Sequence, residues 1–371
     1  MFFGNEMANY LHLYNIPNSY QFHRGGQIEN GLIAYETWGT LNQDKSNAIL
    51  ILTGLSADSH AASHTEHDTA GWWEFMIGPG KAIDTNRWYV ICASSLGSCK
   101  GSTGPCSPNP KTKQAYRFDF PDLCLEDIAN TSVMLCQSLS IERLHATIGP
   151  SMGGMSALAL LFKHNNYTKH LVHIASGMAS PPFSTAIRSL QREAILKDEN
   201  FNQGHYSAAN WPEEGMKFAR KIGMLSYRSA AEWIDRFPRS LKKVPEHAFG
   251  IEFPVESYLE HHANQFIHKF DPISYLYLSR AMDWFDGRSY AHPRGSNPFT
   301  PIQLKSSLIV GAKTDLLFPV MLQTELHHLL LDAGINSELV LTDSIQGHDA
   351  FLVDQKTFSQ LIGDYLVESA V

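Results

Sequence analysis

The chain has 371 residues, of which 43% are hydrophobic and 18% are charged. This apolar content excludes a mainly disordered protein, because its burial can offset the entropy that is lost on ordering. The 37 acidic residues outnumber the 29 basic ones, and the net charge of -8 argues against a nucleic-acid partner, since backbone phosphates require clustered Lys and Arg. At roughly 100–200 residues per domain, the length suggests two units.

Nothing in the sequence indicates export or a membrane span. Residues 1–18 lack a basic segment followed by a long apolar run, and no later run of apolar residues is long enough to span a bilayer. The five cysteines include no CxxC pair, which is typical of a reducing compartment rather than of a disulfide framework. We therefore expect a cytoplasmic protein that does not bind membranes.

The first part of the chain alternates short apolar runs with longer amphipathic stretches. Apolar residues at helical spacing predict helices at 122–139 and 152–162. The apolar runs predict buried strands at 48–52, 88–92, 146–148 and 170–174. Strands that alternate with helices in this way form a mostly parallel sheet that is covered by helices on both faces.

After residue 180 the pattern changes. It predicts only helices, at 186–195, 214–222, 229–237 and 255–270, followed by a connector at 287–301 that is rich in Gly, Pro, Ser and Asn. Strands resume at 307–310 and 337–341, and a last helix is expected at 356–366. We therefore predict a discontinuous α/β core, residues 1–180 and 298–371, with a helical lid domain inserted at 181–297.

The segment Gly149-Pro-Ser-Met-Gly153 matches G-x-S-x-G and lies between a predicted strand and a predicted helix. A sharp turn at this point requires small flanking residues, and it lifts the Ser151 hydroxyl towards the N–H groups at the start of the helix. This context favours a nucleophilic serine. The alternative is a tight turn in which the serine is only structural.

A nucleophilic serine needs a base and a carboxylate that orients the base. Asp315 follows the predicted strand at 307–310, and His348 follows the strand at 337–341. The order Ser151, Asp315, His348 is the order found in α/β-hydrolase folds, so we predict this fold and this catalytic triad. The oxyanion hole should combine the N–H of Met152 with that of Leu55, which follows the strand at 48–52.

Several longer motifs carry a resemblance to a known family. They are Trp72–Glu74, Gly78–Gly80, Leu96–Pro105, Gly149–Met155 and Gly347–Phe351, and together they resemble the homoserine acetyltransferase family over nearly the whole chain. The resemblance implies an α/β-hydrolase-fold acyltransferase with a helical lid, usually a homodimer. Such enzymes bind no cofactor. They use acyl-CoA as a co-substrate and transfer its acyl group to an amino-acid hydroxyl by a ping-pong route.

Within that family, three segments are similar to the serine O-acyltransferase branch, which includes serine O-succinyltransferases and some serine acetyltransferases. They are Gly54–His60, Ser95–Cys99 and Arg188–Glu193. The resemblance favours L-serine as acceptor and a role in cysteine biosynthesis, with succinyl-CoA or acetyl-CoA as donor. The alternative is a homoserine O-acyltransferase of methionine biosynthesis. The acceptor-specificity candidates are Gly54, Leu55, Ser56 and Asp58.

The resemblance also implies how the substrates are held. Arg220 matches the position that binds the α-carboxylate of the amino acid, and Asp349 the position that takes its ammonium group. From the sequence alone, Arg220 would be one more surface arginine. Arg188, or Arg192, could bind the free carboxylate of a succinyl group, and the alternative for these is a salt bridge on the helix surface.

Other classes of function remain to be separated from acyl transfer. A serine esterase on the same fold would carry the same triad, and a non-catalytic, partner-binding relative of the fold would not need it intact. We predict no metal site, because no carboxylate–histidine helix surrounds His60, His64 and His67, and their segment has the character of a loop.

Overall fold

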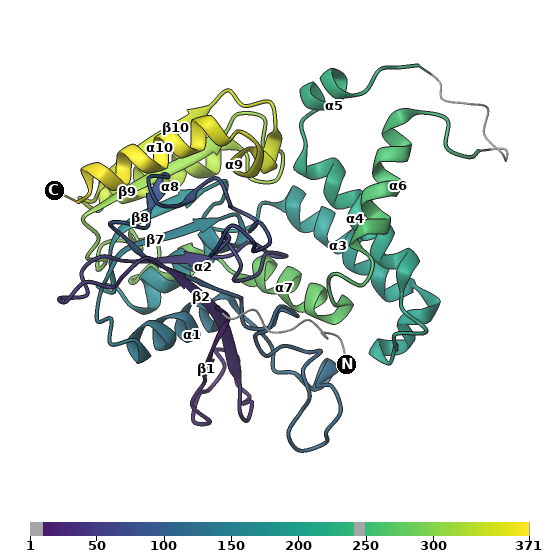
Figure 1. Cartoon of the computed structure of the whole chain (residues 1–371), viewed down its shortest axis with the longest axis horizontal. Coiled ribbons are helices and arrows are strands. Elements are labelled where there is room, and N and C mark those ends of the chain that lie inside the picture. The colour runs from purple at the N-terminus through teal and green to yellow at the C-terminus, as the bar shows by residue number, and fades with distance from the viewer. Residues whose placement is uncertain (1–9, 241–248, 371) are drawn as a thin grey trace.

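The computed structural model describes residues 10–240 and 249–370, and it is built on a single large sheet (Figure 1). The sheet has eight strands in the order β1-β2-β6-β3-β7-β8-β9-β10. The bounds are β1 His12–Asn15, β2 Leu32–Trp38, β3 Ala48–Leu52, β6 Tyr89–Ala93, β7 Leu144–Pro150, β8 Thr168–Ile174, β9 Ser306–Ala312 and β10 Asn336–Thr342. The strands from β6 to β10 along this order run parallel, whereas β1 and β2 pair antiparallel at the edge.

The predicted strands are confirmed, and β1 and β2 are additional. A second, two-stranded ladder of β4 (Ile77–Gly78) and β5 (Ile83–Asp84) was also not predicted, because each strand is only two residues long. The strand β3 illustrates why the parallel strands are apolar throughout. Leu50 and Leu52 face one hydrophobic cluster, while Ile49 and Ile51 face the other, so both faces of this strand are buried.

Helices cover both faces of the sheet. On one face α1 (Leu125–Ser138), α2 (Met152–Lys163) and α8 (Val320–Asp332) contribute to the larger cluster; on the other, α10 (Gln355–Glu368) packs with Trp73 in the smaller cluster. The predicted helix at 122–139 begins only at Leu125, because the side chain of Asp127 caps the N–H of Cys124 at 2.8 Å. The remaining short helices are α9 (Ala350–Val353) and the 3-10 turns η1 (Arg117–Asp119), η2 (Glu199–Gly204), η3 (Gly287–Tyr290) and η4 (Gly347–Asp349).

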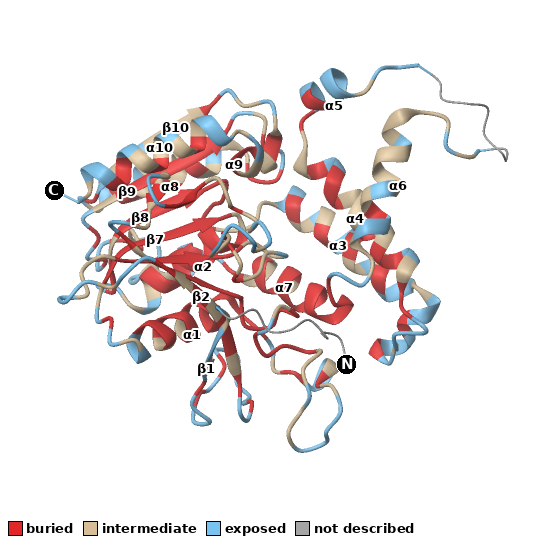
Figure 2. Ribbon diagram, in the orientation of Figure 1, coloured by how far each residue is buried: buried red, intermediate tan, exposed pale blue. Residues whose placement is uncertain are grey.

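The described part of the segment between β8 and β9 carries five α-helices joined by turns and loops. These are α3 (Pro182–Lys197), α4 (Glu213–Tyr227), α5 (Ala230–Arg236), α6 (Pro254–Phe266) and α7 (Pro272–Trp284). The helices α3 to α6 stand away from the sheet, and α5 and α6 carry much half-buried and exposed surface (Figures 1 and 2). In contrast, α7 is buried along most of its length and belongs to the same hydrophobic cluster as α1 and α2. The predicted lid boundaries at 181 and 297 stay a prediction.

This layout fixes where chemistry can occur. The carboxyl ends of parallel strands meet at one edge, and the loops after β3, β7, β9 and β10 all leave the sheet there. None of the helices within residues 10–240 and 249–370 has the length and apolar character that a bilayer crossing requires.

Candidate active site

Three side chains from separate loops meet at the carboxyl edge of the sheet. The Oγ of Ser151, after β7, lies 2.8 Å from Nε2 of His348, in the loop after β10. The Nδ1 of the same ring lies 2.8 Å from Oδ2 of Asp315, after β9. A hydroxyl, an imidazole and a carboxylate in this order can remove the hydroxyl proton and stabilise the imidazolium that results.

The turn that presents Ser151 is strained and leaves no room for larger neighbours. Ser151 has φ 54° and ψ -121°, a region that a residue with a side chain rarely adopts. A Cβ on Gly153 would lie 1.9 Å from the carbonyl oxygen of Leu52, and a Cβ on Gly149 would lie 2.2 Å from that of Gly153. The glycines therefore allow the close approach of the turn to β3 that exposes the hydroxyl.

The surroundings of His348 favour proton uptake. His348 and Asp315 are buried, at 5% and 4% exposure, and Oδ1 of Asp315 accepts hydrogen bonds from the N–H groups of Leu317 and Phe318 at 2.8 and 2.9 Å. Burial lowers the pKa of His348, but the charge and hydrogen bond of Asp315, with the charge of Asp349, outweigh it, so the pKa is raised. The imidazole is therefore a stronger base than an isolated one.

A cavity of about 340 Å³ opens beside Ser151 and His348. The backbone N–H of Leu55, which lines it, donates no hydrogen bond to any described residue, and Met152 is the first residue of α2, so its N–H has no acceptor within the helix. Both groups are free to donate to an oxyanion. The lining residues are Gly54, Leu55, Ser56, Ala57, Trp72, Pro150, Ser151, Arg220, Tyr227, His348, Asp349, Phe351 and Leu352.

Arg220 brings an unpaired positive charge to this cavity. Its guanidinium lies over the rings of Phe266 and Tyr227, at 5.0 and 5.9 Å, and its Nε is buried without a hydrogen-bond partner. No ion pair within residues 10–240 and 249–370 involves Arg220, although the neighbouring Lys221 pairs with Glu260. A guanidinium that is fixed by two rings and lacks an acceptor is suited to bind a carboxylate.

Asp349 adds a carboxylate on the same cavity. Its Oδ2 lies 3.1 Å from Nε of Arg228, and burial raises its pKa, although the charges of Arg228, His348 and Arg220 oppose that rise. The segment just after α4 supports the loop that carries His348, because the hydroxyl of Ser229 donates a hydrogen bond to the carbonyl of Ile345.

Gly347 shows how closely the two segments approach. It has φ +64°, and a Cβ there would lie 2.7 Å from the carbonyl oxygen of Tyr227 at the end of α4. Only glycine adopts this conformation and this contact without strain. The residue before His348 is therefore packed closely against the end of α4.

Arg188 and Arg192 are paired, but not on the surface. The Nε and Nη2 of Arg188 lie 2.8 and 2.6 Å from Oδ1 of Asp283, and Nη1 of Arg192 lies 2.6 Å from Oδ2. Arg188 is 5% exposed, so the pair is buried, and it does not line the cavity. Two guanidinium groups share one carboxylate, which leaves an excess positive charge close enough to lower the pKa of His348.

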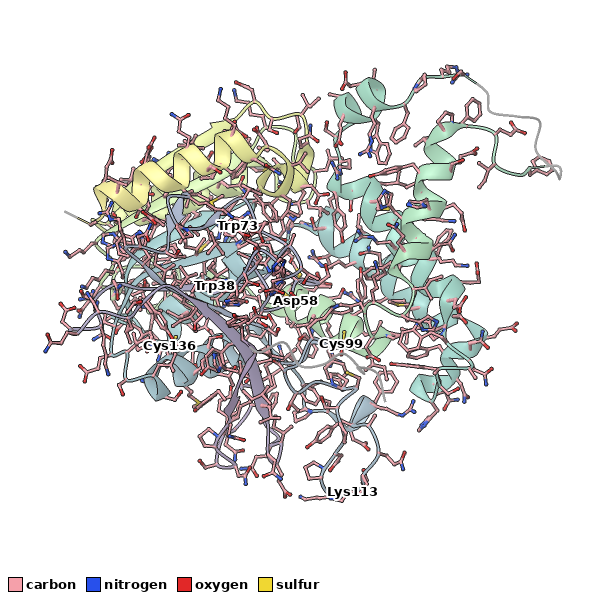
Figure 3. The ribbon with its side chains drawn as sticks, in the orientation of Figure 1. Trp38, Asp58, Trp73, Cys99, Lys113 and Cys136 are labelled. Atoms are coloured by element: carbon pink, nitrogen blue, oxygen red, sulfur yellow. The ribbon has the colours of Figure 1, made fainter. Side chains whose placement is uncertain are left out.

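The predicted acceptor-specificity residues separate into two groups. Gly54, Leu55 and Ser56 line the cavity, whereas Asp58 does not. Its carboxylate accepts the N–H of His60 at 3.1 Å, and its carbonyl accepts the indole N–H of Trp72 at 3.0 Å. Asp58 therefore shapes the loop that carries Trp72. In Figure 3, Asp58 lies with the sheet and the helices that cover it, and not with the helices α3 to α6.

The histidines lie in a loop, as predicted, but the sequence analysis missed a carboxylate beside them. Glu36, on β2, places Oε2 2.9 Å from Nδ1 of His60 and 2.8 Å from Nε2 of His64, and the three could hold a metal ion. His67 is exposed and takes no part.

The hydrogen bonds around these three residues favour an ion-paired network instead. Nε2 of His60 lies 2.7 Å from the carbonyl of Thr69, so both ring nitrogens face acceptors and both must carry protons. The hydrogen bond to Glu36 is the main cause that raises the pKa of His60 to about 9. A protonated imidazole has no lone pair for a metal.

Comparisons with known proteins identify the family of this chain. Residues 47–355 match the model of the alpha/beta hydrolase fold family. The chain is 50% identical over 354 residues to a serine O-succinyltransferase of Stenotrophomonas maltophilia (strain K279a), covering 95% of this chain and 96% of the relative. The chain belongs to the α/β-hydrolase-fold acyltransferases, in the branch of the serine O-succinyltransferases.

Two solved structures are also similar. A homoserine O-acetyltransferase from Bacillus anthracis has a TM-score of 0.87 at 29% identity, covering 96% of this chain and 97% of that one. Esterase E22 has a TM-score of 0.86 at 29% identity, covering 96% and 99%. The fold of this acyltransferase is thus shared by proteins that are named for acyl transfer and for ester hydrolysis.

The sequence missed several residues that line the cavity of this acyltransferase, among them Tyr227, Phe351 and Leu352. Tyr227 could have been found, because it lies seven residues after Arg220 on α4, two helical turns along the same face. Phe351 and Leu352 follow Asp349 directly, and no pattern in the sequence indicates which of these apolar residues faces a cavity.

Proposed function

We propose that this acyltransferase moves a succinyl group from succinyl-CoA to the hydroxyl of L-serine. His348 takes the proton of Ser151, whose Oγ attacks the thioester carbonyl, and the N–H groups of Leu55 and Met152 stabilise the oxyanion. The C–S bond breaks, and the CoA thiolate leaves with the proton from His348. L-Serine then enters, and His348 takes its hydroxyl proton. The hydroxyl oxygen of L-serine attacks the succinyl ester on Ser151, which releases O-succinyl-L-serine, and His348 returns the proton to Oγ of Ser151.

The observation that carries this proposal is the pair of opposite charges beside Ser151. Arg220 has a buried Nε without a partner, and Asp349 lies on the same cavity. A free amino acid carries a carboxylate and an ammonium group, which these two side chains complement. A simple ester offers neither charge. The amino-acid acceptor therefore explains the unpartnered Arg220, which ester hydrolysis leaves without a role, while Asp349 also pairs with Arg228.

The succinyl donor is supported by the charge around Asp283. One carboxylate cannot neutralise both Arg188 and Arg192, and the remaining positive charge suits the free carboxylate of a succinyl group. An acetyl group has no such carboxylate. Arg188→Met, which removes one cation, should reduce turnover of succinyl-CoA more than turnover of acetyl-CoA.

Two other functions have specific support. The likeness to a homoserine O-acetyltransferase favours L-homoserine as acceptor, since it has the same charged groups on a side chain longer by one carbon. The likeness to esterase E22 favours hydrolysis. We expect a narrow, dry cavity to select against water.

One assay separates these functions. Succinyl-CoA and acetyl-CoA are each combined with L-serine, L-homoserine or no acceptor, and release of the CoA thiol is measured, with Ser151→Ala as the control. We expect the fastest release with succinyl-CoA and L-serine and little release without an acceptor. Equal release with and without an amino acid would establish hydrolysis instead.

Arg220→Lys tests the role of the guanidinium within that assay. Lysine keeps the charge but loses the fork of donors, so we expect KM for the amino acid to rise by roughly tenfold or more while KM for the acyl donor changes little. An unchanged KM for the amino acid would place its carboxylate elsewhere. Lys217→Arg, one turn before Arg220 on α4, is the matched control.

We also propose that the protein works as a homodimer in the cytoplasm, with no bound cofactor. Support for a dimer comes from large apolar side chains that the inserted helices expose, including Phe218 at 60% and Ile234 at 81% exposure. Support for a reducing compartment comes from the five cysteines, which are all free thiols. Sedimentation analysis of the wild type and of Phe218→Glu tests the dimer.

A further inference from the structure

The amino edge of the parallel sheet, opposite the catalytic loops, carries two adjoining cavities. One of about 430 Å³ lies beside β8, β9 and β10, and its walls include the carboxylates of Glu338 and Glu368. The other, of about 330 Å³, lies where β3, β6, β7, β8 and β9 begin. Within residues 10–240 and 249–370, its walls contain cationic and imidazole side chains and no acidic one, and it shares Lys305, His170 and Ser369 with the first cavity.

The cations around the second cavity lack ion-pair partners among the described residues, although Arg143 donates a hydrogen bond to the carbonyl of Gln303. Arg87, Lys169 and Lys305 line it, and Arg143 lies nearby. None of the ion pairs within residues 10–240 and 249–370 includes any of these four, although acidic residues outnumber basic ones in the chain. Nε of Arg143 is moreover buried without a hydrogen bond. A concave surface that gathers unpaired cations attracts anions.

His170 supplies a donor at the same place. It is 5% exposed, and its Nδ1 lies 2.8 Å from Oγ of Ser306, which in turn lies 2.8 Å from the hydroxyl of Tyr365. Its Nε2 is buried without a partner. His170 lines both cavities. Its Nε2 is left without a hydrogen-bond acceptor, and a ligand oxygen that reaches it would satisfy it.

His145 lines the second cavity together with His170, and the nearby cations lower the pKa of both histidines. Burial, together with Lys305, Lys169 and Arg143, lowers the pKa of His170 to about 4. Burial, with His170, Lys169, Lys305 and Arg87, lowers the pKa of His145 to about 3. Acidic groups also lie around these cations. Glu338 and Glu368 line the first cavity together with His170 and Lys305, and Lys169 and Arg87 are close enough to Asp44 and Asp84 to help lower the pKa of each carboxyl.

We propose that the cationic cavity binds a small oxyanion, either free sulfate or phosphate or the phosphate group of a larger metabolite. Lys169, Lys305 and Arg87 would neutralise its charge, and the Nε2 of His170 would donate to one oxygen once it carries a proton. This site is separate from the catalytic cavity, and it stands whether or not the proposed function holds.

The test uses the full-length protein. Imidazole resonances are followed by NMR as a function of pH while sodium sulfate, sodium phosphate, AMP or sodium chloride is added at matched ionic strength. We expect sulfate and phosphate to raise the pKa of His170 and His145 in a saturable way, and chloride to leave both unchanged. AMP distinguishes the two sources, because tighter binding of AMP than of phosphate indicates a phosphate carried by a metabolite.

Two variants and one control make the test specific. Lys169→Met combined with Lys305→Met should weaken sulfate binding by about tenfold or more, and His170→Gln should weaken it without removing a lysine. Lys356→Met removes an exposed lysine from the first turn of α10 and should change nothing. Equal effects of sulfate and chloride, or unchanged binding in the double variant, would overturn the proposal.

Discussion

The pKa values of buried histidines are shifted in opposite directions at the two edges of the parallel sheet. At the carboxyl edge the pKa of His348 is raised, while at the amino edge the pKa of His145 is lowered to about 3 and that of His170 to about 4. Burial lowers the pKa in all three. The difference is the partner, because Asp315 faces His348, whereas lysines and arginines surround the other two. The ring of His348 is hydrogen-bonded to a carboxylate, whereas the rings of His145 and His170 are hydrogen-bonded to the hydroxyls of Ser369 and Ser306, and this difference decides the direction of the pKa shift.

The largest expected effect tests whether the carboxyl edge is catalytic. Ser151→Ala removes the hydroxyl that His348 contacts, and we expect the turnover number to fall by roughly 1,000-fold or more. Release of the CoA thiol measures it. Ser156→Ala, on the same helix, is the matched control and should retain activity. Substantial turnover by Ser151→Ala would remove this edge from the mechanism.

The next effect tests the turn that presents the nucleophile. In Gly153→Ala the new Cβ would lie 1.9 Å from the carbonyl oxygen of Leu52, so β3 and α2 must move apart. We expect the free energy of unfolding to fall by roughly 3 kcal/mol or more, measured by urea denaturation. Gly54→Ala serves as the control, since its Cβ would meet nothing within 4 Å and should leave stability nearly unchanged.

A third prediction extends the comparison to His60, a partly buried histidine with a carboxylate partner. Glu36→Gln removes that partner, and we expect a loss of roughly 3 kcal/mol at neutral pH, because His60 loses its counter-charge. Urea denaturation measures the loss, and His67→Gln, at an exposed position, is the control. If Glu36→Gln and His67→Gln are equally stable, the hydrogen bonds from His60 and His64 to Glu36 do not stabilise the fold.

The wild type should show the same network in its pH dependence. The pKa of Glu36 falls from 4.5 to about 2 against the effect of its burial, because His60 and His64 donate to it, so its contribution is present above pH 4.5 and lost as the pH falls through 2. The pKa of His60 rises from 6.5 to about 9, so its contribution is complete below pH 6.5 and lost as the pH rises through 9. Glu36→Gln should abolish both changes.

The smallest effect concerns the pH at which the catalytic base acts. His348 accepts a proton only when neutral, and its pKa lies above 6.5, so kcat/KM should decrease as the pH falls through that raised pKa. The midpoint of the acid limb should therefore lie above 6.5. A midpoint at or below 6.5 would mean that Asp315 does not outweigh the burial of His348.

The sequence was sufficient to predict the fold and that Ser151, Asp315 and His348 lie within hydrogen-bond distance of one another, because each signal is local. Ser151, Asp315 and His348 each follow an apolar strand, and the ends of parallel strands share an edge. The partners that come from distant segments could not be predicted. Glu36 lies 28 residues before His64, on a strand that the sequence analysis did not predict. Asp283 lies 95 residues after Arg188. The structure also shows that Asp58 supports Trp72 instead of lining the cavity.

The close contact between Gly347 and the end of α4 has a consequence for how this protein can vary. The inserted helices are part of the scaffold that positions His348, the proposed general base, because the loop of His348 contacts Tyr227 and Ser229. A lid that only covered a finished active site could be exchanged or deleted without moving His348. Under the proposed function, exchanging the insertion for that of a relative would also displace this histidine, so the exchange should change acceptor choice and catalytic rate together.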